Sequence, residues 1–191
     1  MERPQDIGGV PPFLFLNTHF FFSSMKSPLS LSHSDSSSSA RFGKLSLSHG
    51  KIETPFYMPV ATKGSVKHLS LEEVSDMGFR CMISNAFIYY LRPGVNVVKK
   101  AGGIHKFMNW EHNLFTDSGG FQLLDDAFLR ERKEEGVVLN NPFTRKADLF
   151  TPEKCMQVQM DLGSDVAMCL DDVPRFGEKK GKSFYAETLQ R

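Results

Sequence analysis

Cysteine is scarce in this 191-residue chain, and neither sign of charge is in excess. The three cysteines, Cys81, Cys155 and Cys169, are odd in number, and no two have the C-x-x-C spacing of a zinc site. They indicate reduced, mostly buried thiols in a cytosolic protein. The 23 basic and 22 acidic residues leave a net charge of +1. Composition therefore gives no global signal for nucleic-acid binding, and any surface that binds RNA must be a local patch.

Long apolar runs are absent as well. No run approaches the ~20 residues that a membrane-spanning helix needs, so the sequence predicts a cytoplasmic protein with no membrane partner. The hydrophobic content of 40% is nevertheless enough for a sizeable core.

Residues 1–40 differ in composition from the rest. Ser23–Ser39 contains ten serines in seventeen residues, which is too polar to bury a core. The short apolar stretch before it is typical of a targeting peptide, but basic residues are few (Arg3, Lys26 and Arg41), so neither a secretory nor a transit signal is well formed. We predict a disordered Ser/Phe-rich extension over residues 1–40, with a mis-assigned start as the alternative.

The most informative stretch is Asn113–Gln122, with the sequence N-L-F-T-D-S-G-G-F-Q. Its apolar start predicts a buried strand that ends at Asp117. Gly119 and Gly120 then allow a sharp turn with bare backbone N–H groups. A carboxylate at the carboxyl tip of a buried strand is where α/β folds place catalytic groups. For D-S-G-G alone, an Asp that caps the next helix is an equally good interpretation.

Strand and helix patterns alternate around this stretch. A hairpin is expected over residues 43–60, an inserted hairpin over 137–150, and buried strands at 81–85 and 166–170. Helices are expected after the capping box at Ser70, from Pro93 to the glycines at 102–103, over 121–132, and from Pro152 to Gly163. Strands that alternate with helices across short connections predict parallel pairing, so the fold class is α/β.

Asn85, Asp117 and Asp171 each follow a buried strand, and in a parallel sheet they would share its carboxyl end. Two carboxylates and an amide suit recognition of a guanine edge, since a carboxylate accepts from N1–H and the exocyclic amine together. Two carboxylates also suit a hydrolase that cleaves a sugar bond, so the residues alone leave both chemistries open.

Further blocks stand in order on both sides of Asn113–Gln122. They are His49-Gly50, Thr54-Pro55, Met58-Pro59-Val60, Ser84-Asn85-Ala86-Phe87, Leu91-Arg92-Pro93-Gly94, Gly102-Gly103-Ile104-His105, Met108-Asn109-Trp110, Thr151-Pro152-Glu153-Lys154, Leu162-Gly163-Ser164-Asp165 and Leu170-Asp171-Asp172-Val173. From about Arg41 to Pro174 the chain thus resembles the tRNA-guanine transglycosylases, or queuine tRNA-ribosyltransferases, which exchange a guanine base in tRNA for a deazaguanine.

This resemblance implies a (β/α)8 barrel of the TIM type, preceded by an antiparallel hairpin. Such a barrel needs ~250 residues, so we expect residues 41–191 to hold the first half of it. The chain alone would then be inactive, as a fragment or a truncated gene product.

The resemblance also implies site residues. Asp117 would be the general acid/base, Phe121 would stack on the base, Asp171 would recognise it, and Asn85 and Val60 would line the ribose side. The full set of implied substrate-binding residues is Asp117, Ser118, Gly119, Gly120, Phe121, Asp171, Asn85 and Val60, with no metal ligand among them.

Other implied features lie outside this sequence. The covalent nucleophile, another Asp, and a zinc site of three cysteines and a histidine are expected in the later half of the barrel, with no organic cofactor. Expected partners are tRNA, queuine or a related 7-deazaguanine base, and a second subunit in a homo- or heterodimer. Val173 favours queuine, since bacterial relatives usually carry Cys there. Alternatives are archaeosine-type exchange in the tRNA body and a non-catalytic partner subunit.

Overall fold

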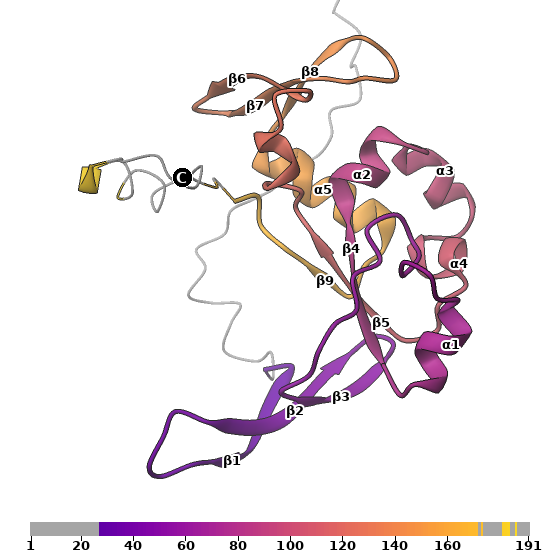
Figure 1. The fold of residues 1–191 in the computed structure, drawn as a ribbon, viewed down its shortest axis with the longest axis vertical. Coiled ribbons are helices and arrows are strands. Elements are labelled where there is room, and N and C mark those ends of the chain that lie inside the picture. Colours follow the sequence, from indigo (N-terminus) through magenta and orange to yellow (C-terminus); the bar gives the residue numbers. More distant parts are fainter. Residues whose placement is uncertain (1–26, 172, 174–180, 184–185, 187–191) are drawn as a thin grey trace, which may run out of the picture.

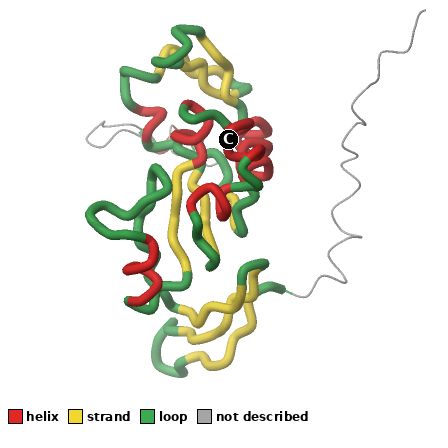
Figure 2. The backbone as a smooth tube through the Cα atoms, turned by 90° about the vertical axis from the view of Figure 1, so that its right-hand side faces the viewer, coloured by secondary structure: helices red, strands yellow, loops and turns green. Residues whose placement is uncertain are grey.

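The computed structural model describes residues 27–171, 173, 181–183 and 186. In this part the chain forms three three-stranded sheets, which follow one another along the long axis of the molecule (Figure 1 and Figure 2). The first contains β1 (Leu29–Ser34), β2 (Arg41–Leu47) and β3 (Gly50–Thr54); the central one contains β4 (Cys81–Asn85), β5 (Asn113–Asp117) and β9 (Val166–Ala167); the third contains β6 (Leu129–Lys133), β7 (Gly136–Asn140) and β8 (Ala147–Phe150).

Helices accompany the central sheet. They are α1 (Leu71–Asp76), α2 (Ala86–Leu91), α3 (Val95–Lys100), α4 (Ile104–Met108), α5 (Pro152–Leu162) and a short 3-10 helix, η1 (Gln122–Leu124). The helices α1 to α4 lie along one side of the central strands in Figure 1, and α5 packs against α2 and α3. No helix in the described residues is both long enough and apolar enough to cross a membrane.

Two helix starts that the sequence predicts are confirmed by their caps. The Ser70 hydroxyl accepts from the Glu73 N–H at 3.1 Å, and the Glu73 carboxylate accepts from the Ser70 N–H at 2.7 Å, which is a complete capping box. At α5 the Thr151 hydroxyl accepts from the Lys154 N–H at 3.2 Å, with Pro152 in the first turn.

The first sheet corrects part of the expected disorder. β1 lies within the Ser-rich segment and pairs antiparallel with β2, so residues 27–40 do not behave as a disordered tail; residues 1–26 lie outside the described part. Leu29 and Leu31 alternate with serines there, which is a strand pattern that the serine content conceals. Every residue of β1 is exposed, so ladder hydrogen bonds hold it rather than burial.

The third sheet corrects a predicted helix. Residues 121–132 form η1 and then β6, instead of one helix. The Glu, Arg and Lys residues of β6 have good helix propensity, but Glu131 and Arg132 pair with Val138 and Val137 of β7. Tertiary pairing outweighs local preference here. The segment 137–150 does form two antiparallel strands, as predicted, within a three-stranded sheet.

The central sheet is parallel and carries the core. β5 pairs with β4 along its whole length, and its middle pairs with β9. β9 is shorter than the predicted strand at 166–170. In the β4–β5 register Asn85 stands directly opposite Asp117. The Phe87 ring of α2 meets the rings of Phe128 and Phe150 edge to face, with 5.6 Å between centroids in each pair, and so joins α2 to the third sheet.

Candidate active site at the carboxyl ends of the parallel strands

The Asn85 side chain supports the carboxylate of Asp117. Its amide Nδ2 donates to Asp117 Oδ1 at 2.6 Å and to Gln122 Oε1 at 2.9 Å, while its Oδ1 accepts from the Ile88 N–H at 2.9 Å. Asn85 is therefore the N-cap of α2 as well as a link between β4 and the turn after β5. Only 1% of its surface is exposed, so its side chain is buried beside Asp117, and its place on the ribose side stays a prediction.

The turn after Asp117 requires both glycines. The Gly119 N–H donates to Asp117 Oδ1 at 2.9 Å, and Gly119 has a φ of +82°, which disfavours other residues. A Cβ on Gly119 would overlap the side chain of Phe87, and one on Gly120 would overlap Asp171. Glycine at these two positions lets the chain turn closely around the two acids.

Asp171 is brought to the same site by Ser118. The Ser118 hydroxyl donates to Asp171 Oδ1 at 2.5 Å, and Ser118 itself is buried while Asp171 is exposed. The two acids that the sequence places at separate strand ends thus stand on either side of one serine. The prediction that Asn85, Asp117 and Asp171 lie at one end of the sheet agrees with these contacts.

Asp117 has an altered acidity. Burial raises its pKa from 3.8 to about 6, and the negative charge of Asp171 adds to the increase; the hydrogen bonds from Gly119 and Asn85 oppose it. A carboxyl group with this pKa exists in both forms near neutral pH. It can therefore give a proton to a departing group and take one from an incoming group.

Two predicted site residues are open to solvent. Phe121 follows the glycine turn and is 73% exposed, so its ring is free to stack on a flat ligand. Val60 is 59% exposed and forms a parallel bridge with Ile83 of β4, which places it beside the central sheet. The Gln122 amide was not among the predicted site residues, although it stands in the same ten-residue stretch and shares a donor with Asp117.

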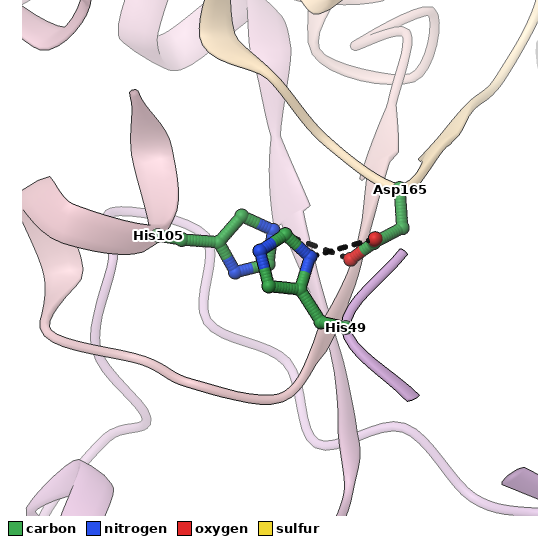
Figure 3. A group of neighbouring side chains, drawn as sticks. All are labelled: His49, His105 and Asp165. Atoms are coloured by element: carbon green, nitrogen blue, oxygen red, sulfur yellow. Dashed lines mark hydrogen bonds and ion pairs between the residues drawn. The ribbon is translucent and has the colours of Figure 1, made fainter. Parts of the chain in front are cut away.

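A second polar cluster lies at the opposite, amino end of the central strands (Figure 3). His49 Nδ1 lies 2.8 Å from Asp165 Oδ1, and His105 Nε2 lies 3.2 Å from Asp165 Oδ2. The Leu114 N–H also donates to Asp165 Oδ2 at 2.9 Å. Burial alone would raise the pKa of Asp165, but His105, His49 and the Leu114 N–H together lower it to about 2. The cluster joins the β2–β3 turn, α4 and the start of β9.

This cluster has the residue types of a metal centre, but its geometry is that of a clamp in which one carboxylate holds two imidazole rings. The three side chains offer ligand atoms within 4.8 Å of one another. However, the two imidazole rings are stacked, with centroids 3.6 Å apart and 21° between their planes. A ring nitrogen directs its lone pair in the ring plane, so two stacked rings cannot both direct theirs at one ion.

The three cysteines of this chain are not among the zinc ligands that the resemblance implies, which are expected outside this sequence. Cys81 and Cys155 are buried, and burial raises the pKa of each to about 12, so both remain thiols. Cys169 is exposed. The one candidate cluster for a metal ion within the described residues contains no cysteine.

The fold is α/β, with two acids at the carboxyl ends of parallel strands, which is where such folds place catalytic groups. The family model described as queuine tRNA-ribosyltransferase matches residues 35–191. The chain therefore belongs to the queuine tRNA-ribosyltransferase family.

Curated relatives carry the same description. A queuine tRNA-ribosyltransferase of Pelotomaculum thermopropionicum is 46% identical over 142 residues, which are 74% of this chain and 38% of the relative. That of Desulforamulus reducens is 48% identical over 133 residues, or 70% of this chain and 36% of the relative. That of Halothermothrix orenii is 39% identical over 167 residues, or 87% and 44%. The chain thus spans less than half the length of these relatives.

Proposed function

We propose that the complete protein exchanges a guanine base of tRNA, at the anticodon wobble position, for queuine or a related 7-deazaguanine. The observation that carries this proposal is the contact set of the D-S-G-G-F-Q turn. Asp117 is held by Asn85 and the Gly119 N–H, and Asp171 is held by Ser118. Together with membership of the family, this set supports base exchange over hydrolysis of an unrelated sugar bond.

In this proposal Asp117 moves the proton of the exchange. The bond between the ribose anomeric carbon and guanine breaks as a carboxylate attacks that carbon, and Asp117 gives its proton to the departing base. The incoming base then attacks the same carbon, releases the carboxylate, and returns its ring N–H proton to Asp117. The attacking carboxylate is not assigned to a residue of this chain. A pKa of about 6 suits a group that must act first as acid and then as base.

The remaining site residues would bind the base. The Asp171 carboxylate can accept from N1–H and the exocyclic amine of a guanine-like edge. Phe121 offers its exposed ring for stacking, which is typically worth about 1–3 kcal/mol per base. The N–H groups of Gly119 and Gly120 donate within the turn, to Asp117 Oδ1 and to the Ser118 hydroxyl, so they hold the two acids rather than the base. Val60 would contact the ribose side.

The barrel and its assembly belong to the same proposal. Val60, β4, β5 and β9 are neighbours in parallel order, which supports the first half of a (β/α)8 barrel. We also propose that the zinc ion and the covalent nucleophile belong to regions of the relatives that this chain does not cover. Assembly with a second subunit and cytoplasmic location stay predictions.

Exchange of radiolabelled guanine into tRNA by the complete protein tests the function. We expect label to enter tRNA, and unlabelled queuine to compete with it. Comparison of wobble-position and tRNA-body transcripts distinguishes this activity from archaeosine-type exchange. If the protein releases free guanine from tRNA and incorporates no label, it is a hydrolase and the proposal is wrong.

A further inference from the structure

Gln159 is a fully buried amide beneath the candidate active site. It lies on α5 and has no exposed surface. Burying an amide is unfavourable unless its hydrogen-bonding groups find partners. Gln159 finds them on β5 and just beyond β9: its Oε1 accepts from the Thr116 hydroxyl at 2.8 Å and from the Met168 N–H at 2.9 Å, and its Nε2 donates to the Met168 carbonyl at 2.8 Å.

The contact with Met168 resembles the contact that a neighbouring strand would make. Gln159 pairs with both the N–H and the C=O of one residue, so its side chain extends the hydrogen bonding of β9. β9 itself ends at Ala167, and the Met168 N–H also donates to the Thr116 carbonyl at 3.1 Å. Met168 is thereby fixed between β5 and α5, although its own side chain is 45% exposed.

Met168 is three residues before Asp171. At its far end this short segment is held by the Ser118 hydroxyl, which donates to Asp171. Gln159 thus fixes the start of the segment that carries the second acid, and Ser118 fixes its end. Asp171 also packs tightly against Gly120, because a Cβ on Gly120 would overlap it.

We propose that Gln159 is a positioning residue that sets the place of Asp171 against Asp117 through the backbone of Met168. The inference rests on the proposed function, since it assigns Gln159 to the exchange reaction without contact with the substrate. A small displacement of a binding group, of about 1 Å, can lower a rate by about 100-fold. The competing interpretation is that Gln159 only holds α5 against the sheet.

Two substitutions separate these interpretations in the complete protein. Gln159→Met keeps the length of the side chain and removes the pairing with Met168. Gln159→Glu keeps an acceptor for Thr116 and the Met168 N–H, but its carboxylate would be a buried charge that faces the Met168 carbonyl, so it is the harsher change. Ser164→Ala is the matched control: the Ser164 hydroxyl contacts Thr116 Oγ1 at 2.8 Å and the Gln159 carbonyl at 3.4 Å, without contact with Met168.

We expect kcat/KM for guanine exchange to fall about 10- to 100-fold in Gln159→Met, at least as much in Gln159→Glu, and little in Ser164→Ala. The negative charge of Asp171 helps to raise the pKa of Asp117. In Gln159→Met, Asp171 would stand further from Asp117 and that pKa would fall, so the pH above which kcat/KM declines should be lower. Hydrogen exchange of the Met168 amide, measured without substrate, should be faster in both Gln159 variants and unchanged in the control.

Three outcomes would overturn the inference. One is unchanged kcat/KM in a Gln159→Met protein whose Met168 amide exchanges faster. Another is an equal loss of activity in Ser164→Ala at the same loss of melting temperature, which would make the role one of stability. The third is an unchanged pH profile alongside a large loss of activity. Failure of the proposed function looks different, since then the wild-type protein itself incorporates no guanine.

Discussion

At the scale of single residues, the altered acidity of Asp117 has two measurable consequences. The fold disfavours its charged form, because burial raises the pKa from 3.8 to about 6. The contribution of Asp117 to stability is therefore greatest below about pH 4 and is lost as the pH rises through 6. An uncharged residue of the same shape has no such loss, and it also cannot transfer the proton.

Asp117→Asn should accordingly lower exchange activity about 10²- to 10⁴-fold, the usual contribution of a positioned acid or base. The variant should match the wild type in unfolding free energy at pH 4, and exceed it at pH 8 by up to about 2–3 kcal/mol, since one pKa unit corresponds to about 1.4 kcal/mol. Denaturant unfolding at the two pH values and guanine-exchange kinetics check both parts. A variant that unfolds readily yet keeps normal activity per folded molecule would show that Asp117 is structural.

Gly120→Ala isolates the placement of Asp171. The added methyl group would overlap the Asp171 carboxylate and backbone, so Asp171 must move away from the position in which it would bind the nucleobase. We expect KM for the incoming base to rise at least about 10-fold. Gly163→Ala is the control: a Cβ there meets nothing within 4 Å but the φ of +77° is unfavourable, so it should lower the melting temperature without raising KM. Equal KM values in wild type and Gly120→Ala would argue against a role for Asp171 in base binding.

At the scale of elements, β4 and α2 meet at a residue that serves both. Asn85 ends the strand, caps the helix and donates to Asp117 and Gln122. Asn85→Ala should therefore lower the free energy of unfolding by about 1 kcal/mol through loss of the cap. It should lower it by about 1–3 kcal/mol more because two acceptors are left without their donor. It should also lower exchange activity.

Thr151→Ala provides the control for Asn85→Ala. It removes the cap of α5, where the Thr151 hydroxyl accepts from Lys154, and should cost about 1 kcal/mol with activity retained. Thermal melting and kinetics of both variants make the comparison. If Thr151→Ala reduces activity as much as Asn85→Ala does, cap loss explains both and the link to Asp117 contributes nothing.

The elements also show how far sequence reasoning reaches. Strands at β4 and β5 and the helix starts at Ser70 and Thr151 follow from local patterns: apolar runs and capping residues mark them without tertiary contacts. The meeting of Asn85 with Asp117 follows as well, since parallel strands bring their carboxyl ends together.

Other features depend on contacts that no local pattern contains. β6 carries the charged residues of a helix and becomes a strand only because β7 pairs with it. β1 is hidden in serine-rich sequence and needs β2 as a template. The roles of Ser118 and Gln159 depend on where Asp171 and Met168 lie after folding, so residues far apart in the chain decide them.

At the scale of the whole molecule, the two ends of the central sheet carry different chemistry. The carboxyl end holds the two acids and the third sheet, and the amino end holds the clamp of His49, Asp165 and His105 (Figure 3). In (β/α)8 barrels, the fold proposed for the complete protein, the amino end serves stability. The clamp joins the first sheet to the central one, so its loss should affect the fold rather than the reaction.

Asp165→Asn tests this division. The change leaves His49 and His105 without a buried carboxylate, and we expect a loss of about 3 kcal/mol of unfolding free energy at pH 7. Because the pKa of Asp165 is lowered to about 2, its stabilisation is present above about pH 4 and disappears as the pH falls through 2. The difference in unfolding free energy between variant and wild type, measured by urea unfolding, should therefore become smaller towards acid pH. A gap that widens there, or kcat lowered in folded protein, would contradict the assignment.

The contacts of Asp117 have a further, stereochemical consequence. Both donors, Asn85 Nδ2 and the Gly119 N–H, bind the same oxygen, Oδ1. An oxygen that already accepts two hydrogen bonds is the weaker proton acceptor, so the proton of the acid form resides on Oδ2. In the proposed exchange, one oxygen then gives the proton to the departing base and takes it from the incoming one. The two bases must approach that oxygen along the same line, so the replacement base has to enter the pocket in the orientation in which guanine leaves it.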